Sequence, residues 1–183
     1  MSLSLITADA GEIGPLTVSD LHALQSEQFG HDEKFHREIA RLPVQDRLRH
    51  MTLHFSKYVG RLLQSHSDDQ QVIVDTFIIA LSSANILGIH LLPTAPRASL
   101  SRQAFIARLG VATGRMSAAC EKLDHLEEFP FRQTLREGVT DIAASVMIYS
   151  PVQQLDLLNL VRTRLASVRG KAFVPGQPEG GEL

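Results

Sequence analysis

Two aspartates stand inside segments that are otherwise rich in apolar residues. Asp75 lies within Ile-Val-Asp-Thr-Phe, and Asp141 lies within Val-Thr-Asp-Ile-Ala. A carboxylate inside an apolar helix is costly to leave unpaired, so each aspartate needs a basic side chain, a metal ion or solvent in a cleft. Glu137 precedes Asp141 by one helical turn and is expected to share its face. These three carboxylates are the candidates for metal chemistry.

Basic side chains stand at comparable places ahead of the two aspartates. Lys57 and Arg61 precede Asp75, and Arg115 precedes Asp141. One interpretation is structural: each aspartate pairs with a basic residue across the bundle, and Lys57 and Arg61 are the obvious partners of Asp75. The other interpretation is that Lys57, Arg61 and Arg115 hold phosphate groups directly, without a metal ion.

Histidine and cysteine offer two further candidates. His50 and His54 stand four residues apart, a spacing that can place two imidazoles on one metal ion, with His66 or Asp69 completing the site. No His-Glu-x-x-His motif accompanies them, and a surface coincidence is favoured. The one cysteine, Cys120, has no nucleophile signature around it and is expected to be a core residue.

Helices must position these side chains, because apolar residues recur throughout the chain at helical spacing. No segment shows the alternation or the tight hairpin turns of β-strands, and aromatic residues make up only 5% of the sequence. The fold class is therefore predicted to be all-α, a bundle of about five to six helices. Two short helical segments, 17–29 and 32–41, are expected ahead of the bundle. The expected helices of the bundle are 44–64, 70–87, 101–123, 131–149 and 152–168.

Particular residues set the expected ends of these helices. Gly30 is expected to stop the first helix, Gly88 to close the fourth, and Pro151 to break the chain after the sixth. The predicted organisation is an N-terminal helical preamble over 1–43, the bundle over 44–170, and a disordered tail over 171–183. That tail is rich in proline and glycine and lacks material for a core.

Composition excludes several classes of protein. The chain has 183 residues, of which 44% are apolar, and a formal net charge of −2, which argues against a dedicated nucleic-acid or membrane-surface binder. A single cysteine cannot form an internal disulfide, so a cytoplasmic location is expected. The apolar stretch 72–92 carries several polar residues and is interpreted as a buried helix rather than a membrane span. The basic cluster of Arg162, Arg164, Arg169 and Lys171 is interpreted as a solvated helix end.

The two halves of the chain align with each other. Ser-Lys-Tyr-Val-Gly60-Arg-Leu matches Val-Ala-Thr-Gly114-Arg-Met, and each segment is followed by one of the two aspartates. Leu91 and Leu157 then stand at the same distance beyond those aspartates. This register predicts a duplicated helical hairpin. A glycine in mid-helix is unfavourable, so Gly60 and Gly114 predict close approach between helices.

The arrangement resembles the MazG-like family of all-α nucleoside triphosphate pyrophosphohydrolases. Their hairpin carries Glu-Glu-x-Gly-Glu-Leu on one helix and Glu-x-x-Asp on the next, and the resemblance covers 48–92 and again 105–165. It implies two tandem hairpins and magnesium held by Asp141, Glu137 and Asp75, with cleavage of a nucleoside triphosphate to monophosphate and pyrophosphate. Asn159 and Arg162 resemble a substrate-binding segment that follows in many members.

This chain departs from the family at the glutamates of the first motif. The first copy has Lys57, Tyr58 and Arg61 there, and the second copy has Val111, Ala112 and Arg115. Neither set can ligate magnesium. Two functions are therefore expected as alternatives: a magnesium-dependent pyrophosphohydrolase with a degenerate metal site, and a non-catalytic nucleotide-sensing or protein-interaction module. No catalytic residue is assigned, and exposed apolar faces are compatible with a homodimer.

Overall fold

The computed structural model describes residues 14–64, 68–94 and 99–168, and these residues form an all-α bundle without strands. The helices are α1 (Val18–Phe35), α2 (Arg37–Ala40), α3 (Val44–Gln64), α4 (Asp69–Leu87), α5 (Arg102–Asp124), α6 (Phe131–Val152) and α7 (Leu157–Val168). The all-α prediction is confirmed.

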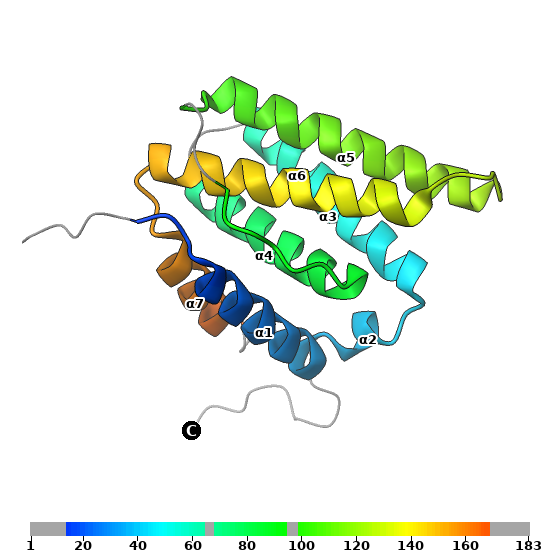
Figure 1. Cartoon of the computed structure of the whole chain (residues 1–183), viewed down its shortest axis with the longest axis horizontal. Coiled ribbons are helices and arrows are strands. Elements are labelled where there is room, and N and C mark those ends of the chain that lie inside the picture. The colour runs from blue at the N-terminus through cyan, green and yellow to red at the C-terminus, as the bar shows by residue number, and fades with distance from the viewer. Residues whose placement is uncertain (1–13, 65–67, 95–98, 169–183) are drawn as a thin grey trace, which may run out of the picture.

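Helix α4 lies at the centre of the bundle. It packs against α3 and α6 on one side and against α1 and α7 on the other, which Figure 1 shows as α5 and α6 above α4 and α1 and α7 below it. Within the described ranges α4 alone is long and apolar enough to cross a membrane, yet 67% of its apolar stretch is buried inside the protein. Helices that are apolar all round are typical of such a central position.

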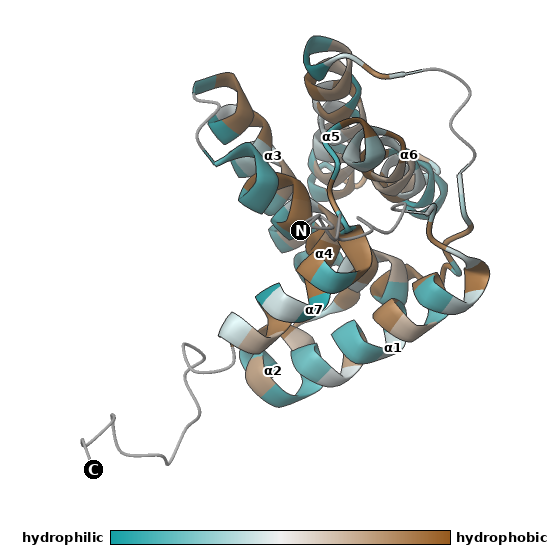
Figure 2. Ribbon diagram, turned by 90° about the vertical axis from the view of Figure 1, so that its left-hand side faces the viewer, coloured by the Kyte–Doolittle hydropathy of each residue, from teal (hydrophilic) through white to brown (hydrophobic). Residues whose placement is uncertain are grey.

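The ends of the long helices follow the capping signals in the sequence. Gly88 ends α4 with φ 63°, a left-handed conformation that glycine adopts without steric cost. Ser101 caps α5, since its hydroxyl accepts a hydrogen bond from the Ala104 amide. Helix α3 has the strongest separation of apolar and polar faces. In Figure 2 its hydrophobic side lies toward the middle of the bundle and its hydrophilic side faces away.

The N-terminal part differs from the expectation. Gly30 does not stop the first helix: α1 begins after the Thr17 cap and continues through Gly30 to Phe35. The break comes at His36, whose backbone leaves the helical region (φ −130°, ψ 42°) before the short α2. Leu21 and Leu24 of α1 are fully buried, so the segment expected as a preamble contributes to the same core as the rest of the bundle.

Pro151 does not break the chain where the sequence suggested. Helix α6 continues through it to Val152, and the last helix begins only at Leu157. A proline near the last turn of a helix removes a single hydrogen bond, and its cost is smaller there than in the middle. The tail predicted for 171–183 lies outside the described residues.

Helices α3 with α4 and α5 with α6 form two consecutive hairpins, as the alignment of the two halves suggested. The glycines of that alignment do not mark close contacts, however. A Cβ built on Gly60 or Gly114 would meet no atom within 4 Å. The close approach is at Gly138 on α6, where a Cβ would lie 2.5 Å from Cγ of the fully buried Met116 on α5.

Gly138→Ala is expected to lower the free energy of unfolding by about 1 kcal/mol. Overpacking against Met116 costs about 1–3 kcal/mol, and this exceeds the gain of about 1 kcal/mol for alanine in a helix. Gly114→Ala is the matched control, because Gly114 lies in a helix, is exposed and has no atom close to the added Cβ. This variant is expected to raise the free energy of unfolding by about 0.5–1 kcal/mol. Urea denaturation of both variants measures the difference, and stabilisation by both would contradict the close packing.

Candidate functional site

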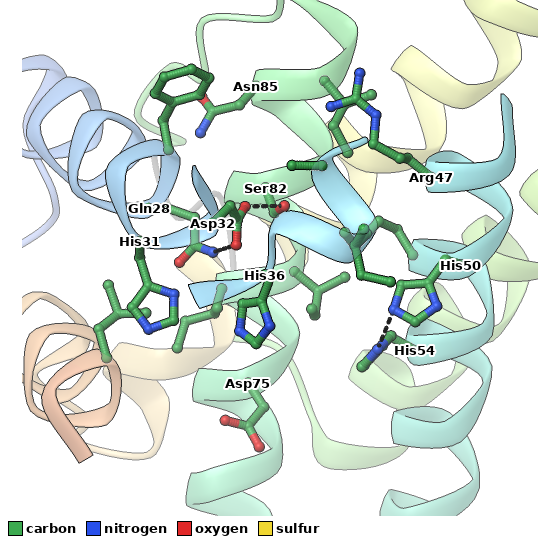
Figure 3. A pocket seen from close by; sticks show the side chains of 18 of the residues that line it. Gln28, His31, Asp32, His36, Arg47, His50, His54, Asp75, Ser82 and Asn85 are labelled. Carbon is green, nitrogen blue, oxygen red and sulfur yellow. Dashed lines mark hydrogen bonds between the residues drawn. The ribbon is translucent and has the colours of Figure 1, made fainter. Parts of the chain in front are cut away.

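A cavity of about 430 Å³ opens between α1, α2, α3, α4 and α7. Its walls are largely apolar, with isoleucines from α2 and α4 and residues of α7 among them. Figure 3 shows polar side chains from α1, α3 and α4, and from His36 between α1 and α2, around this space. The polar lining residues are Gln28, His31, Asp32, Glu33, His36, Arg47, His50, His54, Tyr58, Asp75, Ser82, Asn85 and Arg164.

Asp75 lies in the wall of this cavity and is ion-paired. Arg164 of α7 donates from Nε to Oδ1 at 2.7 Å and from Nη2 to Oδ2 at 3.1 Å. The residue is 8% exposed, and the bidentate contact neutralises its carboxylate. Asp75 therefore has a basic partner, but the expected partners Lys57 and Arg61 are not the ones used. The expectation that Arg164 belongs to a solvated helix end is also wrong.

The histidines of α3 face the cavity as a pair. Nε2 of His54 lies 3.1 Å from Nε2 of His50, and Nδ1 of His54 lies 3.4 Å from the Tyr58 hydroxyl. Burial, assisted by Lys57 and His50, lowers the pKa of His54 to about 4. Burial also lowers the pKa of His50 and raises the pKa of Tyr58. The pair is consequently neutral at pH 7, and one ring can donate a hydrogen bond to the other.

Asp32 is a second carboxylate at the cavity. It accepts hydrogen bonds from Gln28 Nε2 at 2.8 Å and from Ser82 Oγ at 2.6 Å. Burial raises the pKa of Asp32, against the effect of these hydrogen bonds and of His36. Nitrogen atoms of His31 and His36 and a carboxylate oxygen of Asp32 all lie within 4.8 Å of one another.

Arg47 brings a cation to the same cavity. Its Nε is buried and has no hydrogen-bond partner among the described residues. A buried donor without an acceptor is unfavourable by about 1–3 kcal/mol. A ligand that carries acceptor oxygens would satisfy this group.

The carboxylates expected to bind magnesium do not converge. Asp75 lines the main cavity, whereas Asp141 and Glu137 line a separate open depression with Arg115 and Arg136. Arg115 of α5 is ion-paired with Asp141, and Glu137 accepts a hydrogen bond from the Gln133 amide. Both Asp141 and Glu137 are exposed. The carboxylates thus form no common set of oxygen ligands.

The residues expected to bind substrate are also spread over the surface. Arg61 is ion-paired with Asp68, and Lys57 lies over the Tyr58 ring with its Nζ 4.7 Å from the centroid. Arg162 is ion-paired with Glu27 at 2.8 Å, and Asn159, on the first turn of α7, donates to Asp156 just ahead of that helix. Arg115, on α5, is held by Asp141 as described above. None of the five residues lines the cavity, although Lys57 Nζ lies 3.3 Å from Nδ1 of the lining residue His54.

The remaining sequence candidates are placed as follows. His66, offered as a ligand beside His50 and His54, lies outside the described residues. Asp69 accepts from Arg102 Nε at 2.6 Å and belongs to a different part of the surface. Cys120 is buried in the core next to Thr52, as expected, and burial raises the pKa of its thiol.

Sequence reasoning missed the contributions of α1 and α7. His31 and His36 are five residues apart, which places them about 140° apart on a continuous helix, so their spacing gave no signal. The helix break at His36 brings them together. Arg164 lies 89 residues from Asp75, and no local pattern reveals a contact at that separation. The adjacent His31 and Asp32 were the only visible hint.

Comparison with known proteins identified no relative of this chain. No family model matches the chain, and no curated protein and no solved structure matches it either. What the chain does is therefore inferred from the cavity and the residues that line it.

Proposed function

We propose that this chain is a nucleotide-binding module, which holds a phosphorylated ligand in the cavity between α1–α4 and α7 and does not hydrolyse it. The observation that carries the proposal is the cavity itself: apolar walls, a volume of about 430 Å³, and a buried arginine donor without a partner. Small-molecule sites in proteins are typically concave, mostly apolar and of this size.

The parts of such a ligand have complementary places in the cavity. The isoleucines of α4, Ile78, Ile79 and Ile86, offer an apolar surface to a base. Asn85 lies beside them, and its amide group is held by Gln25 of α1. The free Nε of Arg47 suits a phosphate oxygen, since guanidinium groups bind phosphate strongly. The choice of a nucleotide rests on the MazG-like resemblance around Asp75.

Magnesium chemistry does not suit the residues present. Magnesium prefers an octahedral set of oxygen ligands, usually from carboxylates and water. Asp75 is engaged by Arg164 on both oxygens, and Asp141 is ion-paired with Arg115. In each case a guanidinium occupies the place beside the carboxylate where a cation would be needed.

The pyrophosphohydrolase remains a second candidate because of one observation. Asp75, which matches the aspartate of the family's second motif, lies in the wall of the ligand cavity rather than elsewhere on the surface. In that case magnesium would displace Arg164 from Asp75 when the nucleotide binds.

Thermal melting with a panel of nucleoside mono-, di- and triphosphates, with and without magnesium, tests the proposal. A nucleotide at one hundred times its Kd stabilises the folded chain by about 2.7 kcal/mol. We expect this shift without magnesium, its loss in Arg47→Ala, and its retention in Arg108→Ala, where the arginine is exposed on α5 away from the cavity. No shift with any nucleotide would overturn the proposal. Magnesium-dependent release of pyrophosphate, lost in Asp75→Asn, would favour the hydrolase.

Two expectations stay predictions. The cytoplasmic location rests on cysteine usage alone. A homodimer would use exposed apolar residues such as Leu53 and Leu63 on α3 and Val111 on the adjacent α5, which are 64%, 70% and 64% exposed. Light scattering coupled to gel filtration measures the mass in solution, and a monomer at all concentrations would contradict it.

A further inference from the structure

The end of helix α1 gathers three side chains of metal-binding type. Nitrogen atoms of His31 and His36 and an oxygen atom of Asp32 lie within 4.8 Å of one another, at one side of the cavity (Figure 3). Two ligands of one zinc ion lie about 3–4 Å apart, so small side-chain rotations bring all three onto one ion. Among the described residues this is the one group of three such donors.

The backbone holds this arrangement in place. The non-helical conformation of His36 turns the chain back, so that its ring centroid lies 5.4 Å from that of His31. His31 is 7% exposed and packs against Phe35, with 5.0 Å between the ring centroids. Glu38 Oε1 lies 3.7 Å from His36 Nδ1, where a carboxylate can help to orient the ring.

Neighbouring polar groups orient the carboxylate of Asp32. Each of its oxygens accepts one hydrogen bond, from Gln28 on α1 and from Ser82 on α4. Hydrogen bonds of this kind fix the ligands of metal sites in proteins. Gln28 is 2% exposed, and its Oε1 has no hydrogen-bond partner among the described residues. That buried oxygen can accept a hydrogen bond from a ligand in the cavity.

We propose that His31, Asp32 and His36 form a binding site for a divalent transition-metal ion of the zinc type. Two imidazole nitrogens and one carboxylate oxygen suit zinc and similar ions, whereas magnesium prefers oxygen ligands only. The site goes beyond the proposed nucleotide binding and does not depend on it. It differs from the His50–His54 pair, which no third donor of metal-binding type joins within the described part of the chain.

Metal binding to the full chain, without an affinity tag and without nucleotide, tests this proposal. Zn²⁺ is titrated in competition with a chromophoric chelator, and Co²⁺ serves as the spectroscopic probe. We expect one equivalent of Zn²⁺ to bind, visible absorption from the Co²⁺ form, and no competition from a large excess of Mg²⁺. Because no nucleotide is present, failure here leaves the proposed function untouched.

Variants locate the ion. His36→Ala is expected to lower Zn²⁺ affinity by about ten-fold or more, and Ser82→Ala, which removes a hydrogen bond to Asp32, by about ten-fold. His125→Ala is the matched control, because this histidine is exposed at the end of α5. Circular dichroism confirms that each variant is folded. Unchanged affinity in His36→Ala, or loss of binding in His50→Ala instead, would overturn the proposal.

Discussion

Arg164→Met is expected to lower the free energy of unfolding by about 3 kcal/mol. Asp75 has an 11% exposed side chain and depends on the bidentate contact with Arg164 for its neutralisation. Removing one partner of a buried ion pair leaves an uncompensated charge, which typically costs about 3–5 kcal/mol. The lower figure applies here, since Arg164 itself is 28% exposed.

Urea denaturation at pH 7 measures this effect against a matched control. Arg162→Met removes an arginine of the same helix from its pair with Glu27, where the side chains are 44% and 40% exposed. Exposed pairs contribute about 0–1 kcal/mol, so this variant is expected to be nearly neutral. Adding Asp75→Asn to Arg164→Met should recover part of the loss, because it removes the unpaired charge. Equal losses in the two arginine variants would contradict a buried ion pair.

Acid should destabilise the protein between pH 6.5 and pH 4 through His54. Its pKa is lowered from 6.5 to about 4 in the folded chain, chiefly by burial. Above pH 6.5 the imidazole is neutral in both states, and stability is unaffected. Between pH 6.5 and pH 4 His54 is protonated in the unfolded chain but stays neutral in the folded chain. The free energy of unfolding therefore falls until about pH 4 and then levels off. Allowing for solvent screening of a half-buried ring, the loss is about 2 kcal/mol.

The difference between two pH profiles isolates this contribution. His54→Gln removes the titrating group, so its free energy of unfolding should fall by about 2 kcal/mol less than that of the original chain from pH 7 to pH 4. The measurements are made with a metal chelator present. His125→Gln replaces an exposed histidine and should follow the original profile. Parallel profiles for His54→Gln and the original chain would show that burial does not disfavour the charged ring.

The central hairpin could be predicted from sequence because its signals are local. Apolar spacing, the glycine at position 88 and polar residues at the helix ends gave α3 and α4 nearly to the residue. The errors came where tertiary packing outweighed a local signal. Gly30 is tolerated within α1, since Leu21, Leu24 and Gln25 anchor that helix against α4.

The candidate site was harder to predict, because its parts come from distant segments. Asp75 was found from its apolar surroundings, which require a partner for a charge. Its partner on α7 and the contribution of α1 depend on how helices cross, and a single sequence contains no record of that. The sequence suggested Lys57 and Arg61, which precede Asp75 in the chain, as its partners. In the structure Asp141 pairs with Arg115 of its own hairpin, whereas Arg61 pairs with Asp68 and Asp75 pairs with Arg164 of α7.

That difference between the hairpins sets the order in which they can be completed during synthesis. Once α6 has left the ribosome, the α5–α6 hairpin holds both Arg115 and Asp141 and can neutralise its own aspartate. Asp75 on α4 can be neutralised only after α7, the last helix of the described chain, has been synthesised, because its partner Arg164 lies on α7. Contacts of large sequence separation form late because of the entropy of loop closure. A ribosome-bound chain that ends before α7 would therefore carry α4, its most apolar helix, with the charge of Asp75 unneutralised.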